Sequence, residues 1–95
     1  MSTAFETIHN YHERLVVHEV LNASERFQNM AQDDLLADVA CVALNRLPPR
    51  YMRHEVDLIF YLSERERTET ELMIAQSVQF AFEFVQARLA MRARK

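Results

Sequence analysis

Glycine is absent from this chain of 95 residues. Hairpin turns and phosphate-cradling loops both depend on glycine, so a Walker loop and a Rossmann fingerprint are excluded. Proline occurs only twice, and helix-forming residues dominate what is left. The composition therefore predicts an all-α fold, a small domain of three or four helices.

Other features are scarce as well. The one cysteine cannot form an internal disulfide, and no run of side chains approaches the ~20 apolar residues of a membrane span. The first residues lack the order of a secretory signal. The net charge of −3 makes nucleic acid an unlikely partner. We expect one cytoplasmic domain over residues 1–95, with no membrane partner.

Residues for metal binding or catalysis are present but poorly arranged. Glu6 and His9 have the spacing used in di-iron bundles, yet no second such motif exists. His12 and Glu13 lack a histidine at position 16, so the zinc-protease motif fails. We expect the histidines to lie at the surface or to cap helices, and Cys41 to be a small core residue. We expect the protein to hold no metal or cofactor and not to be an enzyme.

The first half of the chain predicts two helices. One begins at a cap on Ser2 or Thr3 and runs to about Ala23. Its apolar face consists of Phe5, Ile8, Tyr11, Leu15, Val16 and Val20. An irregular or short helical connection follows to residue 32, with Phe27 and Met30 as its apolar anchors.

The second helix is predicted from Asp33, where two aspartates suit the helix dipole, to residues 45–47, where Pro48 stops it. Residues 35–44 are almost entirely apolar or small, which predicts a central helix. Asp38 is the exception and is expected to need a partner such as an arginine or a capping amide.

Residues 51–62 are ambiguous because their apolar side chains fit both a strand and a helical turn. We favour a short helix or an extended connector. No other strand is evident in the chain, so a strand here would have to pair across a dimer.

The last helix is predicted from Ser63, which begins one capping box, to about Arg92; Thr68 begins a second. One apolar stripe, which suits the core, contains Ile74, Val78, Ala81, Phe82, Val85 and Leu89. A second, on nearly the opposite side, contains Met73, Phe80, Phe84 and Met91. We interpret the second stripe as a homodimer interface. The alternative is that Phe80 and Phe84 pack on the first helix.

Polar side chains gather around the two prolines. One rigid turn is flanked by Asn45, Arg46, Arg50, Tyr51 and Arg53. Because the prolines restrict the backbone there, hydrogen-bond donors on these side chains can be held towards a ligand with little loss of conformational entropy. Guanidinium groups match phosphate oxygens and the O6/N7 edge of guanine, and arginine or tyrosine planes stack on purines. The turn is therefore a candidate binding corner.

Residues 38–51, with the core A-L-N-R-L-P-P-R-Y at 43–51, resemble the signature of the late competence development protein ComFB family. A weaker match is Ile8-His9-Asn10-Tyr11 with Glu13. The resemblance implies a cytoplasmic homodimer without catalytic activity that binds cyclic di-GMP and passes the signal to motility, biofilm or competence functions. Several family members also carry paired cysteines that hold zinc; residues 28–34 contain none, so that site is not carried over.

This resemblance makes cyclic di-GMP the candidate ligand. The candidate site comprises Arg46, Arg50, Tyr51 and Arg53, with Asn45 and with Asn10 or Tyr11. One alternative is that Arg50 and Tyr51 lock the proline turn against Asp38 and the first helix. At the level of function, the alternative is a helical homodimeric adaptor that binds a protein partner and no nucleotide.

Overall fold

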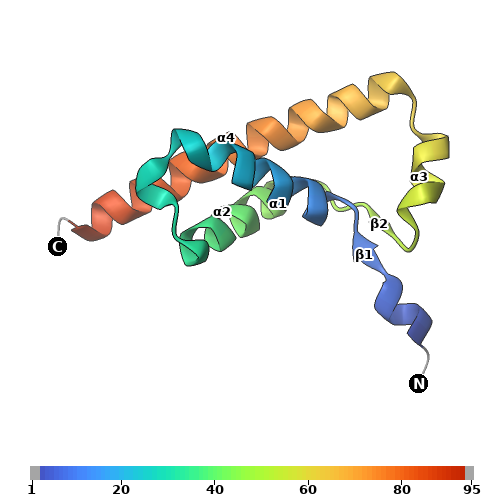
Figure 1. Cartoon of the computed structure of the whole chain (residues 1–95), viewed down its shortest axis with the longest axis horizontal. Helices are drawn as coiled ribbons and strands as arrows, with labels where there is room; N and C mark the ends of the chain where they lie inside the picture. The colour runs from blue at the N-terminus through green and yellow to red at the C-terminus, as the bar shows by residue number, and fades with distance from the viewer. Residues whose placement is uncertain (1–2, 94–95) are drawn as a thin grey trace.

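The computed structural model describes residues 3–93 and confirms a predominantly α-helical fold with a long C-terminal helix (Figure 1). Its α-helices are α1 (His12–Ala23), α2 (Asp33–Arg46), α3 (Glu55–Tyr61) and α4 (Glu64–Ala93). Its two strands are β1 (His9–Asn10) and β2 (Tyr51–Met52). Short 3-10 helices occupy Thr3–Thr7, Ser24–Arg26 and Gln28–Met30, and the last two confirm the predicted short helical connection.

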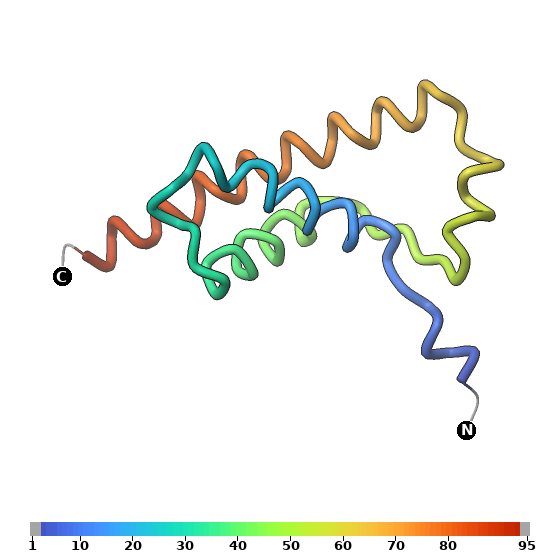
Figure 2. Tube along the Cα trace, viewed as in Figure 1, coloured from blue at the N-terminus to red at the C-terminus, as the bar shows by residue number. Residues whose placement is uncertain are grey.

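The core lies where α1 and α2 pack against the C-terminal half of α4 (Figure 2). Phe82 is fully buried at its centre, and its ring stacks on Phe27 with the centroids 4.5 Å apart. The predicted inner stripe of α4 faces this core, and Met30 is buried beside it. The buried members of the core are Val16, Val20, Ala23, Met30, Val39, Ala43, Leu47, Ile74, Val78, Ala81, Phe82 and Val85.

The start of α4 confirms Ser63 as its cap and corrects the second predicted capping box. The Glu66 amide donates to the Ser63 hydroxyl over 3.1 Å, which satisfies one free amide of the first turn. Thr68 lies inside the helix, where its hydroxyl donates to the Glu64 carbonyl over 3.0 Å. Thr68 is therefore not a cap, because Ser63 already begins the helix.

Helix α2 has the predicted bounds and packs on both α1 and α4, as expected of a central helix, but the expected burial on all of its sides is wrong. It buries Val39 and Ala43 in the core, whereas Asp38 and Cys41 are exposed. Cys41 is thus not a core residue. The apolar run of the sequence predicted burial all round, but the neighbouring helices cover only one side of α2.

The first helix begins about nine residues later than predicted, at His12. Residues 3–7 form a 3-10 helix, and Phe5 and Ile8, expected on a covered face, are exposed. Ser2, the other candidate cap, lies outside the described residues. The helix starts late because residues 9–10 are extended and pair with β2, with His9 opposite Met52 and Asn10 opposite Tyr51. The strand at residue 51 therefore pairs with β1 of the same chain. Pairing across a dimer, which the sequence suggested such a strand would need, is not required.

The ambiguous segment contains both an extended part, β2, and a short helix, α3, as favoured from the sequence. Helix α3 lies near the N-terminal end of α4, away from the packed core (Figure 1). It buries only Leu58 and exposes Val56, Ile59, Phe60 and Tyr61. None of the helices within residues 3–93 has both the length and the apolar character needed to cross a membrane.

Candidate functional site

The side chain of Asn10 joins the start of α1 to the turn that follows the prolines. Its Oδ1 accepts a hydrogen bond from the Arg50 amide over 3.0 Å and another from the His12 amide over 3.1 Å. The first amides of a helix have no partner within the helix, so the bond from His12 also acts as a cap. One side chain thus fixes two segments that are 40 residues apart in the sequence.

Arg50 is held by its backbone on both sides. Its amide donates to Asn10, and its carbonyl accepts a bond of 2.7 Å from the Tyr11 amide. Because these bonds use only main-chain atoms of Arg50, the guanidinium group is left free for other contacts. The turn is therefore locked against the start of α1, as one part of the alternative interpretation proposed, but through the backbone of Arg50 and the side chain of Asn10. Among the described residues Asp38, which that interpretation also named, is exposed and forms no hydrogen bond or ion pair with the turn.

The exposed side chains of Arg50, Tyr51 and Arg53, which we call the arginine corner, project from this fixed segment. Tyr51 keeps 68% of its surface exposed. Arg53 Nε donates to the Thr7 hydroxyl over 2.8 Å, which leaves the terminal nitrogens of its guanidinium group available. The structure thus brings together five of the seven predicted site residues: Asn10, Tyr11, Arg50, Tyr51 and Arg53.

Arg46 has a different neighbour. Its guanidinium carbon lies 3.7 Å from the centroid of the Phe80 ring, a cation–π contact that ties the end of α2 to α4. Asn45, next to it, is exposed at the end of α2. Arg46 covers one face of the Phe80 ring. The alternative to a dimer interface had Phe80 pack on the first helix instead.

The outer stripe of α4 is only partly exposed. Phe80 and Phe84 stack with their centroids 5.9 Å apart, and both remain accessible, as does Met91. Met73 is half-buried and packs against the core. Three of the four residues assigned to a dimer interface are thus available for one.

His12 was expected to be a surface or capping histidine, but it is buried, with 3% of its surface exposed. Its ring hydrogen-bonds to the carbonyl of Pro48, and its Nδ1 has no partner among the described residues. Burial lowers the pKa of His12 below 6.5, nearby Arg50 lowers it further, and the bond to Pro48 opposes them. The sequence signal that could have found it is the four-residue spacing of His12, Val16 and Val20, which places all three on one helical face.

Ionisable residues elsewhere do not gather into a metal site. Within residues 3–93, no group of three or more histidine, cysteine, aspartate or glutamate side chains is arranged to hold a metal ion. Glu55 of α3 instead pairs with Arg14 of α1 over 3.1 Å and approaches His9 at 3.8 Å. These contacts connect α3 to α1 beside the arginine corner.

The geometry places the two sequence motifs, one near residue 10 and the other near residue 50, in direct contact. The model of the family described as late competence development protein ComFB matches residues 9–89, which includes both motifs and the whole core. The chain belongs to the ComFB family. Membership of this family suggests a competence-related regulatory role. A search of curated proteins found no match to the chain.

Replacing Asn10 with alanine tests the link between the two motifs of this ComFB chain. The Arg50 and His12 amides would both lose their acceptor, so we expect the free energy of unfolding to fall by about 1–2 kcal/mol. Urea denaturation followed by circular dichroism measures this change. Asn10→Asp keeps an acceptor at the same place and should recover most of the loss; equal losses in both variants would show that the hydrogen bonds do not matter.

The buried His12 predicts a pH dependence. Its folded-state pKa is depressed, so near pH 6.5 and below the unfolded chain binds a proton that the folded chain does not. The free energy of unfolding should therefore fall as the pH is lowered from about 6.5 towards about 5. Denaturation over this range should show a smaller slope for His12→Gln and an unchanged slope for the exposed control His18→Gln. Parallel slopes in all three proteins would contradict the assignment.

Proposed function

We propose that this ComFB-family chain is a cytoplasmic, non-enzymatic regulatory module that binds cyclic di-GMP at the arginine corner. In this proposal the chain acts as a homodimer and passes the nucleotide signal to motility, biofilm or competence functions. The observation that carries the proposal is the double backbone anchoring of Arg50, which leaves its guanidinium group exposed beside Tyr51 and Arg53.

The chemistry of the corner suits the ligand. Cyclic di-GMP carries two phosphates and two guanines. Arg50 and Arg53 present forked donors for phosphate oxygens or for the O6/N7 edge of guanine, and the exposed Tyr51 ring offers a face for stacking. Since the Asn10 and Tyr11 bonds fix the backbone in advance, little backbone entropy is lost when a ligand binds.

The proposal also assigns Arg46 and Asn45, at the end of α2, to the site, although Arg46 contacts Phe80 in this structure. The contact of Arg46 with Phe80 links this site to the outer stripe of α4. A nucleotide that drew Arg46 away would uncover the Phe80 ring. In this proposal, nucleotide binding is thereby coupled to the dimer surface formed by Phe80, Phe84 and Met91.

The second candidate function is a helical adaptor that binds a protein partner and no nucleotide. The observation that favours it is α3, whose Val56, Ile59, Phe60 and Tyr61 are exposed within seven residues. Contiguous apolar surface of this kind often marks a protein interface. An adaptor would tolerate loss of the arginine corner, whereas a nucleotide receptor would not.

Isothermal titration with cyclic di-GMP, with GTP and cyclic di-AMP as competitors, distinguishes the two functions. We expect selective binding that Arg50→Ala weakens by about 10- to 100-fold, because one charge-assisted hydrogen-bonding group is lost. Arg92→Ala is the matched control, since it removes an exposed arginine near the C-terminal end of α4, at the opposite end of that helix from the corner (Figure 1). Affinity for cyclic di-GMP should be unchanged in this control.

Circular dichroism must show that Arg50→Ala keeps its helical content, because the backbone bonds of Arg50 do not depend on its side chain. An unfolded variant would support a purely structural role for Arg50. No heat with cyclic di-GMP in the parent protein would reject the receptor function and leave the adaptor.

A further inference from the structure

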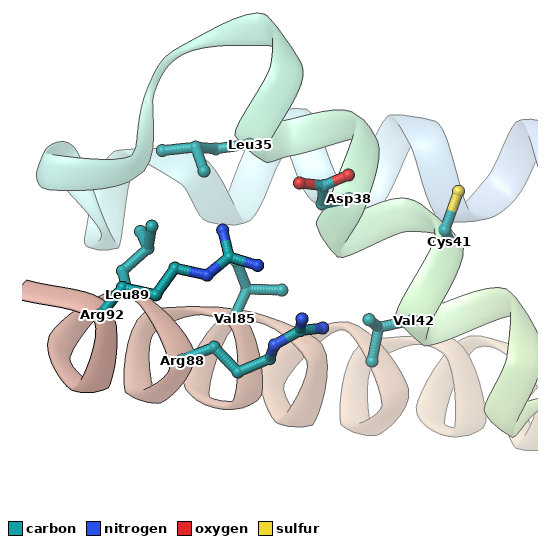
Figure 3. A pocket seen from close by; sticks show the side chains of 8 residues that line it. All are labelled: Leu35, Asp38, Cys41, Val42, Val85, Arg88, Leu89 and Arg92. Carbon is teal, nitrogen blue, oxygen red and sulfur yellow. The ribbon is translucent and has the colours of Figure 1, made fainter.

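A groove that the proposed function does not use lies between α2 and α4 (Figure 3). Its cavity volume is about 350 Å³, which is within the range of small-ligand sites. Asp38 and Cys41 lie on the α2 side, the Arg92 side chain extends from α4 into the space between the helices, and the Arg88 side chain lies along α4 at the edge of the groove (Figure 3). Its apolar lining consists of Leu35, Val42, Val85 and Leu89.

The charged groups of the groove have few partners of their own. Among the described residues, Asp38 forms no ion pair with either arginine, so the partner expected for this carboxylate is not supplied by the fold. Arg88 makes only a long contact with the Phe84 ring, at 5.9 Å from its centroid. The groove therefore offers two guanidinium groups on one wall and a carboxylate on the other, over an aliphatic floor.

We propose that this groove binds a free aliphatic α-amino acid such as leucine. The α-carboxylate is held by Arg88 and Arg92, which lie one helical turn apart on α4, and the α-ammonium group is held by Asp38. The aliphatic side chain covers the floor formed by Val42, Val85 and their neighbours. Each part of the ligand thus meets a group of matching charge or polarity.

The lining favours an amino acid over a nucleotide. Nucleotide sites commonly place an aromatic side chain against the base, but the residues that line this groove are aliphatic or charged. A zwitterion would also pair its carboxylate with the arginines on one wall and its ammonium group with Asp38 on the other. A simple anion would leave the Asp38 carboxylate facing it without a partner of opposite charge. The proposal is independent of the arginine corner, since it uses none of the corner's residues.

Isothermal titration of the full chain with L-leucine tests the proposal, and we expect binding in the millimolar range. Isovalerate lacks the ammonium group, isoamylamine lacks the carboxylate, and glycine lacks the side chain. Each should bind at least about tenfold more weakly than leucine, because each loses one of the three contacts. Equal affinities for leucine and any one of these compounds would overturn the corresponding contact and the proposal with it.

Variants locate the site. Arg92→Gln and Asp38→Asn should each weaken leucine binding by about tenfold or more, because each removes one charge from the ligand's partners. Both residues are exposed, so neither variant is expected to prevent folding. Arg67→Gln, the matched control on α4, should bind leucine as the parent does. Equal weakening by the control would show non-specific charge attraction and overturn the proposal.

Discussion

The hydrogen bonds of Asn10 are the constraint on which the end of the molecule that carries the arginine corner depends. By accepting from both Arg50 and His12, Asn10 fixes where α1 begins, how β1 meets β2 and how the chain leaves the two prolines. The same bonds keep the backbone of Arg50 in place without using its side chain. Rigidity and an available guanidinium group therefore arise from one interaction.

The arginine corner lies apart from the packed core that stabilises the fold. Packing of α1 and α2 on the C-terminal half of α4, centred on Phe82, forms the core, while the arginine corner and α3 lie towards the other end of α4 (Figure 1). His12 connects the two regions, because it is buried with the core residues of α1 and bonds to Pro48 of the turn. Arg46 provides a second connection through Phe80. The corner can therefore change its contacts while the core remains packed.

Local signals in the sequence predicted the fold well where they were strong. The prolines ended α2 and Ser63 began α4 at the expected places, and the inner stripe of α4 was correctly assigned to the core. The prediction failed where contacts distant in sequence decide the outcome. The pairing of residues 9–10 with 51–52 interrupts a helical pattern, and one-sided packing exposes Cys41 on an apolar helix. Five of the predicted site residues lie together. Only the structure shows that the hydrogen bonds of Asn10 hold them in place and that His12 is buried next to the proline turn.

The most direct test of nucleotide binding at the arginine corner is an NMR titration of the isotopically labelled chain with cyclic di-GMP. If the nucleotide binds there, the largest amide shifts fall on residues 10–12 and 50–53, with smaller shifts near Phe80, which Arg46 contacts, and little change around Phe82. Shifts confined to α3, or an unchanged spectrum at saturating nucleotide, would contradict the claim that the Asn10-anchored arginine corner is the binding site.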